Sequence, residues 1–210
     1  MFEIILGAVL LLLYLAFWAW HSPWAHKLTR AEIDHYMAII EKLPLPSEEV
    51  KGIASRIRRW AEADDGKPFY MFNLIHFFLQ LRTIAGAPEF KGTPQECNAY
   101  YMKRLRWLWL SHAAYPIIDG VPQAENLINI QPERTWGQVT VVRYPNRRTL
   151  LKLVSDPAYA PVEPYKFMAM ELDLVPVSGR IVIPDLRWLL GCGLIIVFLL
   201  VAWVRAVWLR

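Results

Sequence analysis

Two long runs without charged side chains, one near each end of the chain, constrain the fold more than any other feature. Ile4 to Trp20 and Trp188 to Val204 are each 17 residues of mostly Leu, Ile, Val, Ala and aromatic side chains. As helices they would be about 26 Å long, close to the ~30 Å hydrocarbon thickness of a bilayer. Neither run has the polar stripe that a core helix of a soluble protein normally shows. We therefore expect membrane-spanning helices over residues 1–22 and 186–206.

Basic residues next to the two runs indicate an orientation. Four lie on the inner flanks and two on the outer flanks: Lys27, Arg30, Arg180 and Arg187 against Arg205 and Arg210. Cytoplasmic flanks of membrane spans carry an excess of Lys and Arg. We therefore expect the middle region on the cytoplasmic side of a bacterial cytoplasmic membrane. The first run lacks the basic start and the small-residue end of a signal peptide, so we expect it to be retained.

The remaining composition excludes several classes of protein. The net charge of +4 comes from 23 basic and 19 acidic residues without a long basic run, so no nucleic acid is expected as a partner. Cys97 and Cys192 are the only cysteines and lie in different regions, so neither a disulfide nor a cysteine-rich zinc site is expected. The common phosphate-loop, metalloprotease and nucleophile-elbow motifs are missing, so no metal site is expected. The sequence does not indicate any particular cofactor.

Residues 23–66 show two helical patterns. Thr29 and Glu32 have the spacing of a capping box, in which the two side chains satisfy each other's backbone amides at a helix start. Apolar residues then recur at helical spacing up to Leu43, and again from Val50 to Trp60. We expect a helical neck between the first span and the folded domain. The basic residues of its second helix are either solvated or in contact with lipid headgroups.

Residues 67–179 alternate between strand and helix patterns. The segment Phe69–Phe77 is apolar on both faces, so we expect it to be covered on both sides. Thr93 to Glu96 repeats the capping-box spacing at the start of a helix. Further elements follow: strands over 115–121, 136–144 and 170–177, a strand or loop over 127–130, a helix after Asn146, and helical structure from 156 towards 166. This order predicts an α+β, split βαβ (ferredoxin-like) domain.

Three segments carry a resemblance to a known family. They are the strand Phe69–Ile75, the stretch from Trp136 through Arg148, which includes Pro145-Asn146, and the step Ser155–Tyr159. Over about residues 69 to 178, the chain resembles an uncharacterised bacterial branch of the dimeric α/β-barrel superfamily. The resemblance implies that two ferredoxin-like sheets join into one barrel, so that the chain is a homodimer with a small cavity between sheet and helices. His76 lies where this branch often has arginine, and Asn146 replaces the usual serine.

Few residues are candidates for chemistry. His76 and His112 could converge on one pocket and exchange protons near neutral pH, or they could be two separate, hydrogen-bonded histidines. Arg143 ends a strand where Glu171 or Asp173 could pair with it, so an ion pair competes with an acid–base role. These three are the catalytic candidates.

Three further residues are candidates for ligand binding. Asn73 in an apolar strand must find hydrogen-bond partners, either a ligand carbonyl or a neighbouring strand. Tyr115 and Tyr144 would line a pocket or simply pack.

Two functions of different classes remain open. In the first, the domain binds, or binds and transforms, a small hydrophobic molecule at the membrane surface. In the second, it is a non-catalytic accessory or assembly subunit of a larger membrane complex. An enclosed cavity with several converging polar groups favours the first, and a cavity filled by side chains counts against it.

Overall fold

The computed structural model describes residues 1–24, 26–43, 45–84, 86–124, 127, 135–179 and 185–208. The chain forms two compact units. The first joins the two ends of the chain, residues 1–24 and 179–210, and the second comprises residues 25–178. Each unit is described by itself below.

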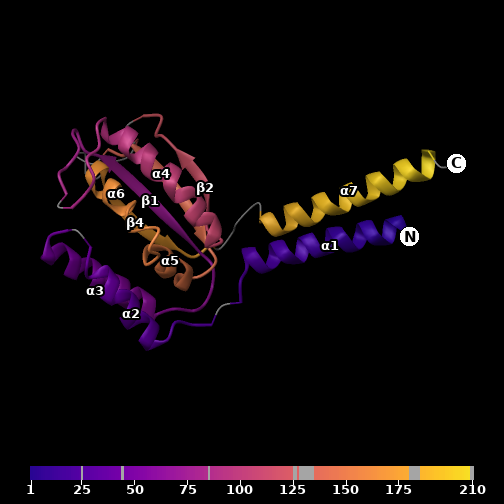
Figure 1. Ribbon diagram of the computed structural model, residues 1–210, viewed down its shortest axis with the longest axis horizontal. Coiled ribbons are helices and arrows are strands. Elements are labelled where there is room, and N and C mark those ends of the chain that lie inside the picture. Colours follow the sequence, from indigo (N-terminus) through magenta and orange to yellow (C-terminus); the bar gives the residue numbers. More distant parts are fainter. Residues whose placement is uncertain are drawn as a thin grey trace. The chain divides into compact units, whose positions relative to one another are not determined.

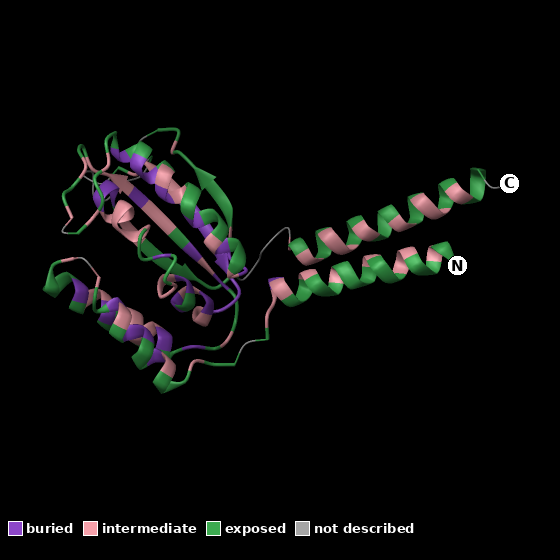
Figure 2. Cartoon of the chain, in the orientation of Figure 1, coloured by how far each residue is buried: buried purple, intermediate pink, exposed green. Residues whose placement is uncertain are grey.

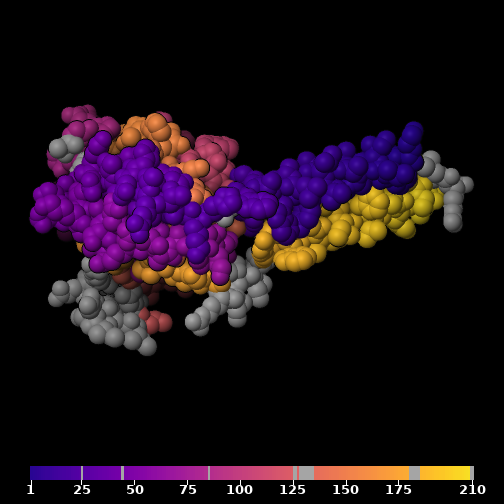
Figure 3. Space-filling view, turned by 90° about the horizontal axis from the view of Figure 1, so that it is seen from below, coloured from indigo at the N-terminus to yellow at the C-terminus, as the bar shows by residue number. Residues whose placement is uncertain are grey.

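The first unit consists of two apolar helices, α1 (Phe2–His21) and α7 (Leu186–Trp208), which lie side by side (Figures 1 and 3). Both are long and apolar enough to cross a membrane. Almost none of their side chains is buried in the chain itself, as Figure 2 shows, because their apolar surface faces outward.

Two contacts show that these helices run antiparallel. Glu3 at the start of α1 lies 3.2 Å from Arg205 near the end of α7. At the other end, the Arg187 guanidinium lies 5.0 Å from the centre of the Trp18 ring.

The second unit is an α+β fold around one antiparallel sheet (Figure 1). Its four strands lie in the order β2-β3-β1-β4. Along the chain, two helices come before the first strand and three lie between strands. The order is α2 (Arg30–Ile40), α3 (Ser47–Glu62), β1 (Phe69–Phe77), α4 (Pro94–Ser111), β2 (Tyr115–Gly120), β3 (Gln138–Tyr144), α5 (Arg147–Val154), α6 (Glu163–Ala169) and β4 (Met170–Val177). Each strand–helix–strand unit is split by a strand of the other, as the sequence pattern predicted.

Three helix starts are fixed by the side chains that the sequence pointed to. Thr29 and Thr93 each form a complete capping box, with Glu32 and Glu96 respectively. The Asn146 side chain accepts a hydrogen bond from the backbone amide of Thr149 at 2.9 Å. Each cap satisfies amides that have no partner within the helix.

Other boundaries differ from expectation. The helix expected from Asp156 begins only at Glu163, because residues 157–162 form turns around Pro157 and Pro161. The second long strand begins at Gln138 rather than Trp136. Of the strand or loop expected over 127–130, residues 128–130 lie outside the described residues.

Aromatic side chains fill the space between the sheet and the helices on one of its faces. Phe69 of β1 stacks on Tyr144 of β3, with ring centroids 5.2 Å apart, and Trp60 meets Phe69 edge-on at 5.0 Å. The rest of this core comes from β1, β3, α4, α5 and the turn after α5: Met71, Tyr101, Leu105, Trp109, Ala114, Val142, Leu153 and Tyr159.

The helices expected as a neck share a core with the sheet unit. Ile33, Met37, Ala54 and Ala61 of α2 and α3 are buried together with Leu151 of α5. The helices α2 and α3 therefore belong to the same compact unit as the sheet. Their side chains cover much of the face of this unit that Figure 3 presents.

Candidate functional site

Tyr144, a ligand-binding candidate, is a core residue. Its ring is buried against Phe69, and burial raises the pKa of its phenol, while a hydrogen bond from the Trp109 side chain acts in the opposite direction. The Tyr101 and Tyr159 hydroxyls lie 3.3 Å apart in the same core, and burial raises both of their pKa values. These phenols stay protonated at neutral pH and bind one another, so they pack the interior rather than line an open pocket.

Asn73 ties two strands together. Its side-chain amide nitrogen donates to the carbonyl of Met71 at 2.9 Å and to that of Thr140 at 3.0 Å. Thr140 is its partner on the neighbouring strand β3. Of the two roles open from the sequence, the structure shows the strand contact, since both amide hydrogens are used by backbone carbonyls.

The two histidine candidates lie at opposite ends of the sheet. His76 lies near the end of β1, opposite Glu171, whereas His112 follows α4 just before Tyr115, which pairs with Arg143 at the other end. At about 3.3 Å per strand residue, these ends are roughly 20 Å apart. The structure therefore does not bring His76 and His112 into one pocket.

Each histidine has partners of its own. His76 Nδ1 lies 2.8 Å from the Thr135 carbonyl, and His112 Nδ1 lies 2.9 Å from the Leu108 carbonyl. Because a carbonyl oxygen only accepts, Nδ1 is the donor in both rings. The second nitrogen of His112, Nε2, lies 3.6 Å from an Asp156 carboxylate oxygen. This is the pattern of separate, hydrogen-bonded histidines.

Arg143 and Tyr115 lie together on the sheet face opposite the aromatic core. Arg143 is buried on β3, and its guanidinium carbon lies 5.6 Å from the centre of the Tyr115 ring on β2. Tyr70 of β1 is opposite Arg143 on the other side. Among the six candidates, this pair is in contact.

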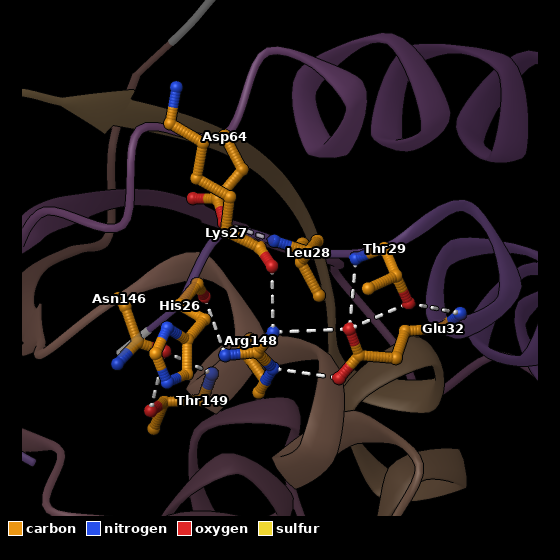
Figure 4. Close-up of polar contacts among 9 residues, drawn as sticks. All are labelled: His26, Lys27, Leu28, Thr29, Glu32, Asp64, Asn146, Arg148 and Thr149. Atoms are coloured by element: carbon orange, nitrogen blue, oxygen red, sulfur yellow. Dashed lines mark hydrogen bonds and ion pairs between the residues drawn. The ribbon is translucent and has the colours of Figure 1, made fainter. Parts of the chain in front are cut away.

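The most extensive polar cluster lies elsewhere, where the chain enters the α+β unit (Figure 4). Arg148 at the start of α5 donates from Nε to Glu32 Oε1 at 2.9 Å and from Nη2 to Glu32 Oε2 at 3.1 Å. It also donates to the carbonyl oxygens of His26 at 2.6 Å and Lys27 at 2.9 Å. We call this set of contacts the Arg148 clamp.

A buried carboxylate supports the clamp from the other side. Asp64 accepts from the Leu28 amide at 2.9 Å and from the Gly66 amide at 3.1 Å. The Arg147 side chain lies 3.8 Å from Asp64 and also donates to the Trp60 carbonyl. Residues 26–28, just beyond the first apolar helix, are thus hydrogen-bonded to α5 and to the turn after α3.

The electrostatics of the clamp favour the charged pair. The hydrogen bond from Arg148 is the largest of the effects that lower the pKa of Glu32 to about 2, and the Thr29 backbone amide adds to it. Glu32 is therefore ionised throughout the physiological range. Sequence reasoning found Glu32 as a helix cap but missed this pairing, because no local pattern relates positions so far apart.

Two hollows lie away from the predicted site residues. A groove of about 870 Å³ lies between the start of α3, the segment after β1 and the α6–β4 junction. A second hollow of about 530 Å³ lies between α1 and α7 and is lined almost wholly by apolar side chains. Among the described residues, no group of three or more His, Cys, Asp or Glu is placed to hold a metal ion.

Comparison with known proteins supports the fold alone. No protein family model and no curated protein matches the sequence. The chain is similar in structure to RPA0582, a protein of unknown function from Rhodopseudomonas palustris, with a TM-score of 0.53 and 18% identity over 66% of this chain and 98% of that one. A structure of methylated RPA0582 gives a TM-score of 0.53 and 20% identity over 68% and 97% of the two chains. The share of this chain that matches is larger than residues 67–179, so the match extends beyond the predicted ferredoxin-like segment.

Proposed function

We propose that this chain is a membrane-anchored accessory or assembly protein without a catalytic centre of its own. Its α+β unit pairs with a second copy into a ferredoxin-like dimeric α/β barrel, on the cytoplasmic side of a bacterial membrane. The apolar helices α1 and α7 supply the anchor. Lys27 and Arg30, just inside the first of them, favour this orientation.

The observation that carries the proposal is an apolar sheet face without a covering helix among the described residues. Phe72 of β1 lies between Val141 of β3 and Val175 of β4 on the face opposite the aromatic core. Val141 is buried at 2%, but the side chains around it remain exposed, at 36% for Phe72, 45% for Val175 and 56% for Ile118 of β2. Exposed apolar patches of this kind mark interaction surfaces.

A second copy is the partner that suits this face. The row Ile118, Val141, Phe72 and Val175 is apolar across all four strands, so it can pack on a second copy of itself about a two-fold axis. The strand from Phe69 to Phe77 would then be covered on both sides, as its sequence requires. The resemblance to dimeric α/β barrels implies the same pairing.

The number of copies in purified protein tests this pairing. We expect light scattering of the full chain in mild detergent to give two copies, and Val175→Asp and Ile118→Asp to give one copy with an unchanged far-UV spectrum. Ile117→Asp is the matched control, because the bulge in β2 leaves Ile118, not Ile117, opposite Val141. A single copy for the unmodified chain, or two copies for both variants, would refute the proposal.

The state of the candidate residues supports the proposed non-catalytic role. Asn73, His76 and His112 are each hydrogen-bonded to backbone carbonyls in separate places. The space between sheet and helices is filled by aromatic side chains where the family resemblance implied a cavity. A reaction centre needs several polar groups that converge on one space. Among the described residues, the candidates do not converge in this way between the sheet and the helices.

One observation favours a second function, the binding of a small hydrophobic molecule. The groove of about 870 Å³ is within the size range of ligand pockets and combines apolar walls with a few charged groups. Ile53 of α3, Phe78 after β1 and Phe167 of α6 form its walls, and Arg82 lies at 3.7 Å over the Phe78 ring.

Narrowing the groove tests this second function. Mass spectrometry of organic extracts from the purified protein should show a bound small molecule. The Ile53→Trp variant should contain less of this molecule, and Glu62→Trp, at the exposed end of the same helix, should contain the same amount as the unmodified protein. Extracts that contain only bulk lipid, identical in all three proteins, would remove this function and leave the pairing proposal untouched.

A further inference from the structure

Both chain segments that lead to the terminal helices leave the α+β unit at one end of its sheet. β4 ends at Val177, opposite Tyr70 at the start of β1. The Arg148 clamp lies at the start of α5, directly after β3 ends at Tyr144, which is opposite Phe69. We call this edge, where β1 begins and β3 and β4 end, the tethered end.

The tether between α1 and the clamp is short. The clamp holds the chain from His26 onward, and α1 ends at His21, so only residues 22–25 separate them. The five residue steps from His21 to His26 span at most about 18 Å. If α1 crosses a bilayer, as we propose, the clamp and the tethered end are held next to the lipid headgroups.

Helix α4 reaches the same end. It ends at Ser111, and β2 then begins at Tyr115, which pairs with Arg143 beside the tethered end. Its last two turns carry an apolar pair on the outer side: Trp107 is 68% exposed and Leu110 is 36% exposed. A tryptophan this exposed on a packed helix is unusual, because its ring offers a large apolar area.

Basic side chains surround this pair. Lys103, Arg106, Trp107 and Leu110 follow the i, i+3, i+4, i+7 spacing of one helix face, and Lys103 and Arg106 are both exposed. The Arg106 guanidinium carbon lies 5.4 Å from the centre of the Trp107 ring. We call these four residues the α4 patch.

We propose that the α4 patch rests on the anionic surface of the bilayer in which α1 and α7 are anchored. This proposal rests on the proposed membrane anchoring and not on the pairing of two copies. Tryptophan favours the headgroup region, where its ring is in apolar surroundings and its N–H stays hydrated. Lysine and arginine are attracted by anionic lipids over about a Debye length.

The other charges at the tethered end agree with this partner. Lys27, Arg30 and Lys67 are exposed there, against the exposed carboxylate of Asp65 and the half-buried one of Asp156. The excess is positive, which suits an anionic lipid surface. An exposed apolar and basic patch at the membrane-proximal end is the arrangement by which peripheral helices lie on a bilayer.

A spin label next to the patch tests the contact. The full chain with Cys192→Ala and a nitroxide at Ser111→Cys is placed in nanodiscs of phosphatidylcholine, with or without phosphatidylglycerol. Cys97 is fully buried and does not take the label. We expect the label to be shielded from a water-soluble nickel chelate in the anionic discs and to be accessible in neutral discs and in detergent.

Substitutions then separate the patch from its surroundings. Trp107→Ala and the pair K103E/R106E should restore access of the chelate. Since each basic residue contributes about fivefold at an anionic surface, the double variant should lower the ratio of docked to undocked protein at least roughly thirtyfold. The charge-matched control is K51E/R56E on α3, which should change nothing. A label at Ala99→Cys, exposed about three turns before Ser111 on α4, should stay accessible throughout.

The outcomes distinguish the alternatives. Equal access in all discs, unaffected by the patch variants, would overturn the proposal. Shielding that persists in detergent would assign the patch to another protein surface and would also overturn it. A chain that does not co-elute with the disc scaffold at all would instead refute the membrane anchoring.

Discussion

Arg148 and Glu32 lie 116 positions apart in the sequence, yet their side chains form a two-pronged ion pair with N–O distances of 2.9 and 3.1 Å. The same guanidinium holds the carbonyls of His26 and Lys27. One side chain therefore fixes α2 and the chain segment after the first apolar helix to the start of α5.

Removing the guanidinium should destabilise the α+β unit. Arg148→Ala removes the charged donor that Glu32 and two carbonyls share and leaves Glu32 only the Thr29 contacts of the helix cap, and hydrogen bonds to charged groups contribute about 1.5–3 kcal/mol. We expect a loss of about 2 kcal/mol in the free energy of unfolding, measured by urea denaturation in mild detergent. Arg148→Lys should recover less than half, because an ammonium group cannot bind both carboxylate oxygens in the same way. Lys152→Ala, exposed on the same helix, is the control and should cost almost nothing.

The clamp should also make stability depend on pH in the acid range. The pKa of Glu32 is about 2 in the folded protein, below the ordinary value of about 4.3 for an unfolded chain, because Arg148 binds the ionised form. The stabilisation is thus fully present above about pH 4.5 and is lost as the pH falls towards 2. Melting temperatures from pH 6 to pH 2 should show a smaller fall for Glu32→Gln, which keeps the helix cap. Parallel curves for the two proteins would contradict this assignment.

The sequence predicted the fold wherever local chemistry decides it. Capping boxes at Thr29 and Thr93 indicated two helix starts, and a segment that is apolar on both faces indicated the strand Phe69–Phe77, with the bounds that the structure has. The helix expected from Asp156 was misplaced, because Pro157 and Pro161 favour turns that a periodic pattern does not register. How α2 and α3 pack could not be read, since their apolar stripes do not say which element they contact.

The candidate site was harder to predict than the fold. His76 and His112 were placed on plausible elements, but their distance depends on which end of an antiparallel strand each one reaches. Asn73 was identified as a buried amide that needs partners, and the carbonyl of Thr140 became visible only with the register of β1 and β3. Tyr144 faced the core because strand pairing stacked it on Phe69. The sequence therefore indicated which side chains need polar partners, but it did not indicate which distant residues come into contact.

Leu151 should be the main link between α5 and the helices before the sheet. It is only 1% exposed and packs with α2 and α3, whereas its neighbour Leu150 packs on the aromatic core. Leu151→Ala should cost about 2–5 kcal/mol, because it leaves a cavity that the helices cannot fully close. Amide hydrogen exchange should then rise on α2 and α3 first. With Leu150→Ala, the rise should instead appear on α4 and β1.

A charge exchange should test the hairpin of the two apolar helices. Glu3 on α1 lies 3.2 Å from Arg205 on α7, and Arg205 also lies over the Phe2 ring at 4.1 Å. Arg205→Glu places two like charges at this contact and should weaken the pairing of the helix ends by about 1 kcal/mol, or roughly fivefold. The double variant Glu3→Arg/Arg205→Glu restores opposite charges, so it should recover most of the loss.

Disulfide formation between Gly7→Cys and Phe198→Cys reports this pairing, since a Cβ on Gly7 would lie 3.4 Å from the Phe198 ring. The rate should fall in Arg205→Glu and return in the exchanged pair, all in a Cys192→Ala background. Arg187→Glu, at the opposite end of α7, is the matched control and should change this rate less. If Arg205→Glu leaves the rate unchanged, the ion pair does not hold the hairpin together and apolar packing alone accounts for it.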